Sequence, residues 1–161
     1  MLHRYVLAAL FLCTTCIAQE PPADQAKFYK LDFTVKELNG GKVTNSRSFA
    51  TVVGRNRNRN QSIRTGDKVP VQQGGSFSYI DVGVNIDVTD LMQTGNNLEL
   101  NVTADISSVE KDAALPQPII RQIRWASSVD VPLRKPTVLF SSDATGSKSQ
   151  TQLELLATPL Q

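Results

Sequence analysis

Three aspartates, Asp81, Asp87 and Asp90, come closest to a catalytic or metal-binding set in this sequence. Asp81 and Asp87 fall on the polar face of an expected strand, roughly 20 Å apart along the extended chain. That separation is too large for two carboxylates to share one proton or one metal ion. Asp87 and Asp90 are a candidate pair for calcium at the strand end, but a solvated polar face explains all three without a ligand. We therefore predict no catalytic and no metal-binding residue.

The only histidine and both cysteines lie within residues 1–18, as His3, Cys13 and Cys16. This segment has a short basic start, an apolar run and a small residue, Ala18, before the expected cut, which is the pattern of a secretory signal peptide. The apolar run is shorter than the about 20 residues that a membrane-spanning helix needs. The alternative is a lipoprotein signal with Cys16 lipidated, but the leucine and small residues that normally precede such a cysteine are missing.

Cleavage after Ala18 leaves an exported chain with no imidazole and no thiol. Ser-His-Asp catalysis, Cys-His catalysis and structural zinc sites are then excluded. Glycine-rich phosphate motifs are also missing, because Gly40-Gly41 and Gly74-Gly75 are expected in turns and neither pair opens a helix. We predict that the protein is not an enzyme and that it carries no cofactor.

Three arginines, Arg55, Arg57 and Arg59, alternate with asparagine in an expected polar loop, residues 54–61. They suggest a patch for nucleic acid or lipid headgroups, but no aromatic side chains are interleaved to stack on bases. We favour a solvated hairpin tip whose arginines prevent edge-to-edge strand pairing. The 17 basic and 15 acidic residues nearly balance, so we expect no nucleic-acid partner, and membrane association is not favoured.

Trp125 is the single tryptophan and a candidate for stacking on a ligand. Its neighbours on the same strand face are apolar, which favours a place in the core. These neighbours are Ile119, Ile123, Val129 and Val131.

Residues 76–109 form the element around which the rest of the chain is arranged. Apolar and polar residues alternate through two strands, which predicts a β-ribbon with one buried face. The connection is expected at Thr89–Asn97, where Thr94-Gly95-Asn96-Asn97 has turn chemistry. The side chains expected inside are Ile80, Val82, Val84, Ile86 and Val88 in the first strand, and Leu98, Leu100, Val102, Ala104 and Ile106 in the second.

A hairpin precedes this ribbon, with strands at Lys27–Leu38 and Lys42–Val53 joined through Asn39-Gly40, a type I′ turn signal. Its buried faces are expected to carry Tyr29, Leu31, Phe33 and Val35 in the first strand, and Val43, Phe49 and Val53 in the second.

The other expected strands are Ser62–Gln73, Ile119–Val131, Thr137–Phe140 and Gln150–Ala157. Gly66 and Pro70 interrupt the first of these, which indicates an edge or bulged strand. Seven or eight strands and no convincing helix predict an all-β, mostly antiparallel, sandwich-like fold. We expect a signal peptide at 1–18, a disordered leader at 19–26 and a single domain at 27–161.

Several short motifs resemble, in their order and spacing, the β-domain of bacterial secretins, the outer-membrane channel subunits of type II and type III secretion and type IV pilus systems. The similarity covers roughly residues 65–160. The motifs are Val69-Pro70, Tyr79-Ile-Asp-Val-Gly-Val-Asn-Ile-Asp-Val88, Leu98-Glu-Leu-Asn-Val102, Ser107-Ser108, Pro118-Ile-Ile-Arg121, Ser127-Ser-Val129, Leu153-Glu-Leu-Leu156 and Thr158-Pro159.

The chain departs from the secretin pattern at three places. Secretins carry periplasmic N-terminal modules, whereas few residues separate the signal peptide from the first motif here. Ser141-Ser142-Asp143 stands where secretins have Gly-Gly-Leu, and residues 144–152 leave no room for the gate hairpin. The resemblance therefore implies the secretin wall fold without a gated channel.

The first hypothesis is an exported, non-enzymatic protein of the periplasm or outer membrane of a Gram-negative-type bacterium. Its partners would be envelope or secretion-system proteins, or further copies of the chain. One alternative is a subunit of an oligomeric outer-membrane pore. It is less favoured, because the aromatic residues do not cluster at strand ends as interfacial girdles would. The other alternative is a carbohydrate-binding or hydrolytic β-sandwich module, which an exposed Trp125 would support.

Overall fold

The computed structural model describes residues 28–55, 60–110, 118–144 and 148–160, and this part of the chain consists of eight strands and their connections, without a helix. The expected signal peptide and leader, Arg57 and Arg59, and parts of the loops at 110–118 and 141–149 lie outside these residues. The strands are β1 Phe28–Asn39, β2 Lys42–Gly54, β3 Gln61–Gln73, β4 Ser76–Thr94, β5 Asn97–Glu110, β6 Ile119–Pro132, β7 Thr137–Asp143 and β8 Ser149–Leu160.

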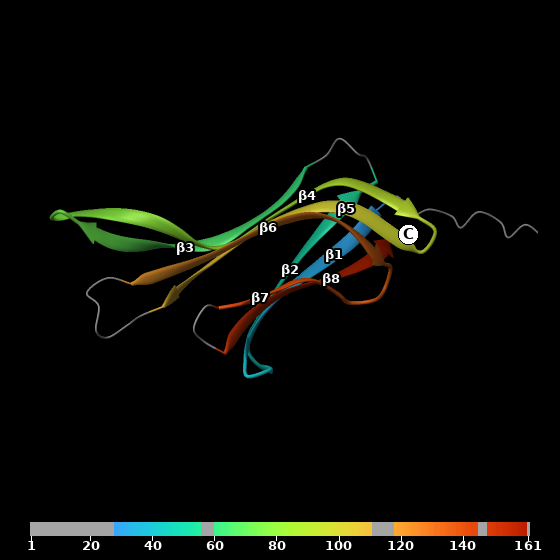
Figure 1. The fold of residues 1–161 in the computed structure, drawn as a ribbon. Helices are drawn as coiled ribbons and strands as arrows, with labels where there is room; N and C mark the ends of the chain where they lie inside the picture. Colours follow the sequence, from blue (N-terminus) through green and yellow to red (C-terminus); the bar gives the residue numbers. More distant parts are fainter. Residues whose placement is uncertain (1–27, 56–59, 111–117, 145–147, 161) are drawn as a thin grey trace, which may run out of the picture.

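Two four-stranded antiparallel sheets form the layers of a sandwich (Figure 1). Sheet A has the order β2-β1-β8-β7, and sheet B has the order β3-β4-β5-β6. The first and last strands are neighbours in sheet A, where Leu31 pairs with Ala157. The expected all-β, antiparallel, sandwich-like fold of seven or eight strands is therefore confirmed.

The core lies between the two sheets and is built from alternate residues of their strands, as the period of two predicts. All four residues expected inside on β1 are buried, as are all five on β5. Sheet A adds Val53, Leu153, Leu155 and Ala157, and sheet B adds Val82, Val84, Ile86, Val88, Leu91 and Val131.

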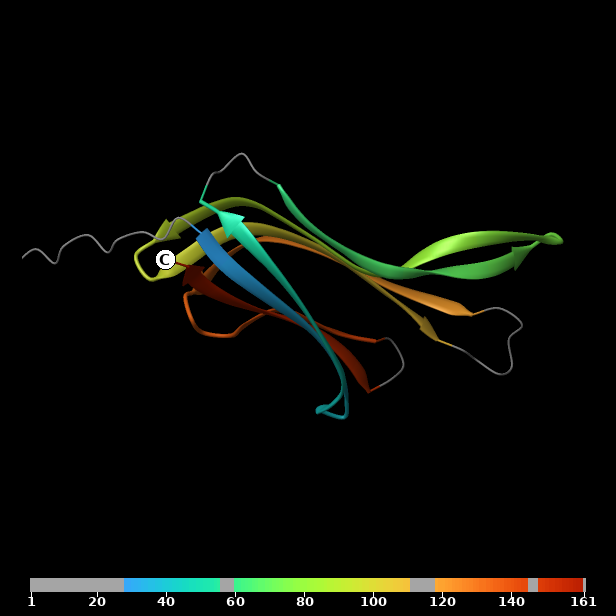
Figure 2. The same ribbon diagram turned by 180° about the vertical axis from the view of Figure 1, so that it is seen from behind.

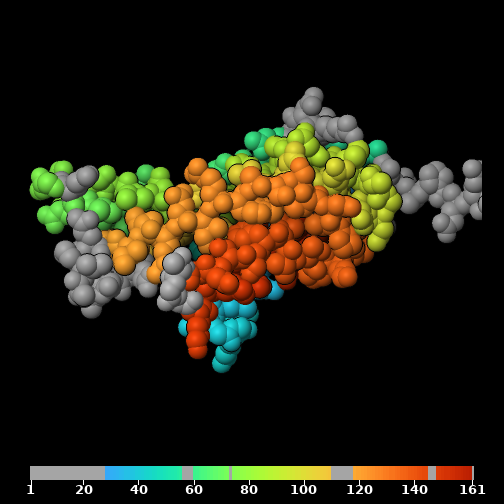
Figure 3. All heavy atoms as spheres, in the orientation of Figure 1, coloured from blue at the N-terminus to red at the C-terminus, as the bar shows by residue number. Residues whose placement is uncertain are grey.

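Three residues expected on apolar inner faces are exposed instead, namely Ile80, Val43 and, at the first position of β6, Ile119. Ile80 is 39% exposed, because it lies beyond the Val84↔Ile106 pair at which the β4–β5 ladder ends. Val43 is 48% exposed. A register shift near the end of the first hairpin pairs it with Leu38, and this hairpin end projects away from the sandwich in Figure 3.

The turns differ slightly from those expected. The first hairpin turns at Gly40-Gly41, which both have positive φ, and Asn39 still pairs with Lys42 as part of the ladder. The β4–β5 connection is shorter than 89–97, because β4 continues to Thr94 through an irregularity between Thr89 and Met92. The positive φ of Asp90 lies within that irregularity.

β3 is an edge strand, as expected, but Gly66 and Pro70 do not interrupt it. It pairs with β4 without a register shift from Gln61↔Val88 to Gln73↔Ser76. An edge strand tolerates proline because one side of its backbone has no neighbouring strand to bond. β7 and β8 are longer than expected and reach Asp143 and Leu160. No helix in the described part of the chain is long and apolar enough to cross a membrane.

Candidate functional site

The most exposed apolar surface of the described chain belongs to the arm, which we define as residues 67–82 of β3 and β4. The β4–β5 ladder ends at Val84↔Ile106, whereas β3 and β4 stay paired to their tip. The arm is therefore a two-stranded ribbon that projects beyond the sandwich, as Figures 1 and 2 show from opposite sides. The green residues in Figure 3 show its outer part standing clear of the other strands.

Both faces of the arm carry apolar side chains. On one face Phe77 and Tyr79 are 67% and 65% exposed, and Pro70 is the register partner of Tyr79. On the other face Val69 pairs with the exposed Ile80. A two-stranded ribbon with two uncovered apolar faces is unusual in a water-exposed element and marks a contact surface.

The apolar part of the arm is bounded by charge at its base. No charged residue lies between Lys68 and Asp81 in the sequence. These two residues are register partners, and their Nζ and Oδ1 atoms lie 3.3 Å apart. Because the side chains are 72% and 81% exposed, the ion pair adds little stability. It marks the border between the uncharged tip and the charged sheet.

The outer face of sheet B is polar, and two of its carboxylates are held by side chains from neighbouring strands. Arg64 on β3 donates to both oxygens of Asp87 at 2.7 and 2.9 Å, and Ser62 donates to the same carboxylate. Partial burial alone would raise the pKa of Asp87, but these hydrogen bonds and the charge of Arg64 together hold it below its ordinary value.

Asp105 on β5 is held in the same way from β6. Gln122 Nε2 donates to it at 2.8 Å and Arg124 Nη2 at 2.9 Å. The hydrogen bond from Gln122 is the largest cause that lowers the pKa of Asp105; burial opposes it, and Arg124 adds a hydrogen bond and a positive charge. The sequence analysis did not single out Asp105, although the alternation of polar and apolar residues already placed it on the polar face of its strand, as it placed Asp87.

The structure does not bring the three aspartates of the sequence analysis together. Asp81 pairs with Lys68, Asp87 with Arg64, and Asp90 accepts from Asn101 Nδ2 at 2.7 Å. Within the described ranges, no group of three or more His, Cys, Asp or Glu residues is placed to hold a metal ion. The three carboxylates therefore serve pairing between strands in this structure.

Trp125 is half-buried against the core and stacks at a tilt on Phe140, with the ring centroids 5.3 Å apart. This contact joins β6 to β7 across the side of the sandwich. The position agrees with the preferred core interpretation, because the ring is partly buried and packs on Phe140. Of the three loop arginines, Arg55 is described and exposed.

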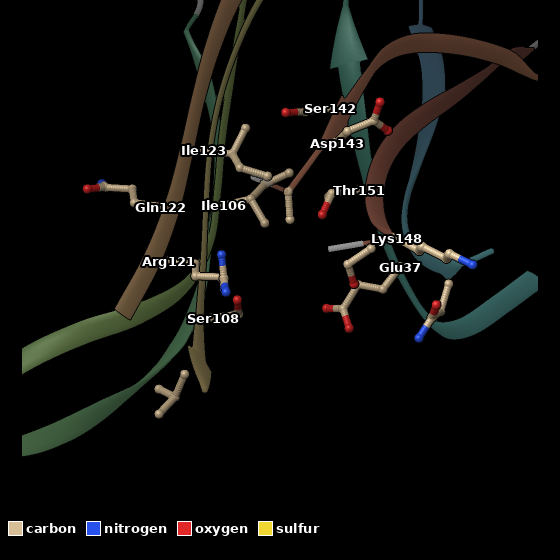
Figure 4. Close-up of a pocket in the computed structure, with 14 residues that line it drawn as sticks. Glu37, Ile106, Ser108, Arg121, Gln122, Ile123, Ser142, Asp143, Lys148 and Thr151 are labelled. Carbon is tan, nitrogen blue, oxygen red and sulfur yellow. The ribbon is translucent and has the colours of Figure 1, made fainter. Parts of the chain in front are cut away.

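Beyond Trp125 the two sheets diverge and leave a cavity of about 730 Å³ at one end of the sandwich (Figure 4). Ile106 and Ile123 line the side of sheet B, and Ser142 and Thr151 line the side of sheet A. One wall of this cleft is therefore apolar and the other carries hydroxyl groups. Glu37, Asp143, Arg121 and Lys148 lie around it, so its charges are mixed.

No family model matches the sequence, and no curated protein matches it. Its fold is similar to solved secretin structures. InvG of the Salmonella SPI-1 type III secretion injectisome matches with a TM-score of 0.53 at 9% identity, over 84% of this chain and 65% of that chain. InvG in the basal body with PrgH and PrgK matches with the same score and identity, over 84% and 46%. PulD of the Klebsiella pneumoniae type II secretion outer membrane complex matches at 0.51 and 12% identity, over 84% and 39%.

The chain has the secretin β-domain fold. At these identities the likeness is one of fold, and the chain spans less than two thirds of each secretin chain. The motifs that suggested the resemblance lie on the strands expected to carry them. Val69-Pro70 and Tyr79 lie on the arm, Leu98–Val102 opens β5, and Leu153–Leu156 lies in the middle of β8.

Proposed function

We propose that this protein is an exported, non-enzymatic envelope protein whose secretin-like β-domain serves a protein-secretion or pilus-assembly machine. The observation that carries the proposal is the likeness of the fold to the secretin InvG, over 84% of this chain at a TM-score of 0.53. The basic start, apolar run and small residue of residues 1–18 support export. The proposed location is the periplasm or outer membrane of a Gram-negative-type bacterium.

The polar groups of the sheets support a non-enzymatic role. Asp87 and Asp105 sit in hydrogen-bonded pairs on an open sheet face, outside the cleft. Trp125 packs on Phe140, which counts against a carbohydrate-binding module. That alternative was expected to use Trp125 as an exposed stacking platform. Acrylamide quenching checks this alternative directly, because Trp125 is the only tryptophan. We expect partial protection, and quenching as strong as that of free tryptophan would favour the alternative.

We propose that the partners are envelope proteins or further copies of this chain. The structural neighbours support this class of partner, since InvG is seen with PrgH and PrgK, and PulD with PulS and the PulC HR domain. The exposed surface best suited to such contacts is the arm, because Phe77, Tyr79 and Ile80 gather there.

A subunit of an oligomeric pore is the second candidate. Two observations favour it: both edges of sheet B, β3 and β6, are long strands without an outer neighbour, and Phe77 and Tyr79 lie together on the arm. These two aromatic residues are two positions apart in the strand, so they share one face. Edge strands of this length are templates for pairing with another chain.

The deciding measurement is the mass of the chain from residue 19 onward by light scattering after size-exclusion chromatography, with and without detergent. We expect a monodisperse monomer in plain buffer, which would contradict the pore candidate. Partners would then be sought by pull-down from envelope fractions. A ring of many subunits that requires detergent would instead replace the first proposal with the second.

A further inference from the structure

Sheet B forks where the arm begins. The β4–β5 ladder stops at Val84↔Ile106, but β3 and β4 stay paired outwards to Gln73↔Ser76, and β5 and β6 to Glu110↔Ile119. Beyond the fork, the four-stranded sheet has become two separate two-stranded ribbons. Figure 1 shows these ribbons as two prongs, one green and one yellow to orange, that leave the same sheet in different directions.

Two glycines face each other on the arm side of the fork. Gly66 and Gly83 are register partners of β3 and β4, and their backbones approach too closely for any side chain. A Cβ on Gly83 would lie 2.0 Å from the Thr65 carbonyl oxygen and 2.4 Å from the Gly66 Cα. A Cβ on Gly66 would lie 2.5 Å from the Val82 carbonyl oxygen. The strands can therefore coil sharply here only because both positions lack a side chain.

The side-chain hydroxyl of Ser107 lies at the point where the two ribbons separate. The Gly83 N–H donates to Ser107 Oγ at 2.9 Å, and the same hydroxyl lies 3.4 Å from the Gly83 carbonyl oxygen, to which it donates. Ser107 thus serves both backbone groups of Gly83 where the β4–β5 ladder has ended. A hydroxyl rotates to suit its partners. This link therefore fixes the direction of the arm relative to β5 less firmly than a ladder of backbone hydrogen bonds would.

We propose that Gly66, Gly83 and Ser107 form a joint on which the arm changes direction relative to the sandwich. The arm keeps its own structure during such motion, because the β3–β4 ladder runs through the joint without a register shift. The motion presents either apolar face of the arm to a surface while the core between the sheets stays closed. This inference goes beyond the proposed function, since it holds whatever surface the arm meets.

The test is a distance measurement between paired spin labels in the chain from residue 19 onward, which has no native cysteine. Ser78→Cys on the arm and Ala50→Cys on β2 report the arm, and both positions are exposed. Ala50→Cys with Thr103→Cys on β5 is the reference pair within the sandwich, also at exposed positions. We expect the arm distances to be spread roughly twice as widely as those of the reference pair.

Substitutions at the joint supply the second part of the test. Ser107→Ala should widen the arm distribution further, and Ser107→Thr, which keeps the hydroxyl, should restore it. Gly83→Ala should shift the mean arm distance, because β3 and β4 must separate to admit the methyl group. Ser108→Ala, the adjacent serine that lines the cleft, is the matched control and should leave both distributions unchanged.

The reference pair shows whether each variant is folded, since its distances must stay the same. An arm distribution in the unsubstituted chain as narrow as that of the reference pair would overturn the joint. So would arm distances that respond equally to Ser107→Ala and Ser108→Ala. Neither result would contradict the proposed envelope function, which rests on the fold and is tested by the mass measurement.

Discussion

Tyr29 illustrates how one residue closes the end of the core. Its ring is fully buried in β1, and its hydroxyl donates to Gln93 Oε1 on β4. Gln93 in turn donates from Nε2 to the Gly95 carbonyl oxygen at 2.7 Å. Burial raises the pKa of the Tyr29 phenol, and the nearby Arg55 charge opposes that rise. The phenol therefore stays protonated and keeps its donor role, so that both buried polar side chains are satisfied.

The Tyr29→Phe substitution tests this contact. It keeps the ring but leaves Gln93 Oε1 without its donor in a buried site, which should cost about 2 kcal/mol of unfolding free energy. Urea denaturation measures the change. Tyr79→Phe on the exposed arm is the control, and we expect its effect to stay within about 0.5 kcal/mol. Equal effects of the two substitutions would contradict the role assigned to Gln93.

The pairing of Asp87 and Asp105 predicts how stability depends on pH. Both carboxylates have a lowered pKa in the folded chain, whereas an unfolded aspartate titrates near about 3.9. Their contribution to stability is therefore complete above about pH 4 and is lost as the pH falls through the folded pKa.

Urea midpoints between neutral pH and about pH 3 should fall less steeply in the Asp87→Asn and Asp105→Asn variants. Asp81→Asn, whose ion pair is exposed, is the control. If the urea midpoint of the Asp87→Asn and Asp105→Asn variants fell with pH as steeply as that of the unsubstituted chain, these carboxylates would not stabilise the fold.

At the scale of the elements, each strand buries alternate residues only as far as another layer covers it. β4 shows both situations, since Val82, Val84, Ile86 and Val88 are buried, while Ile80 on the same face is exposed. The change occurs between Val82 and Ile80, just beyond the end of the β4–β5 ladder at Val84↔Ile106. The arm therefore contributes surface for contacts, and the sandwich contributes the stability.

This division predicts that the arm is dispensable for folding. Replacing residues 69–80 by Asn-Gly connects Lys68 to Asp81, which are already register partners, through a two-residue turn that suits a hairpin. The free energy of unfolding should change by less than about 1 kcal/mol, because an isolated two-stranded ribbon adds little stability. Chemical denaturation followed by circular dichroism measures it. Loss of a cooperative transition would show that the arm belongs to the folding core.

At the scale of the whole molecule, the two sheets depend on each other. Each sheet presents one apolar face, and the core forms only where these faces meet. Trp125 on sheet B and Phe140 on sheet A extend that contact to the side of the sandwich. The first and last strands pair in sheet A, so the chain closes this sheet only when β8 has joined β1.

We therefore expect the two sheets to unfold together. Tryptophan fluorescence reports the environment of Trp125 between the sheets, and far-ultraviolet circular dichroism reports all strands. In urea the two signals should give one coincident midpoint, as for a two-state domain. A fluorescence transition at lower urea than the loss of strands would show that the sheets separate before they unfold.

The sequence by itself determined which strand faces are apolar and which class of fold results. Alternation is a local property of a strand, so residues such as Leu31, Ile86 and Leu100 could be assigned to the inner face without knowing their neighbours. Turn glycines likewise act locally, and the motifs indicated the secretin fold. Residue types alone also identified Asp81, Asp87 and Asp90 as carboxylates of a polar face.

Only the tertiary structure decided what depends on residues far apart in the chain. The pairing of β1 with β8, the sheet order and the end of the β4–β5 ladder are set by long-range packing. Ile80 repeats the pattern of Val82 and Val84, yet it is exposed because the opposing layer stops before it. The aromatic residues of the arm, the fork at Ser107 and the cleft have the same origin. Local alternation specifies which face of a strand is apolar, and the extent of the neighbouring strands and sheets determines whether that face is covered.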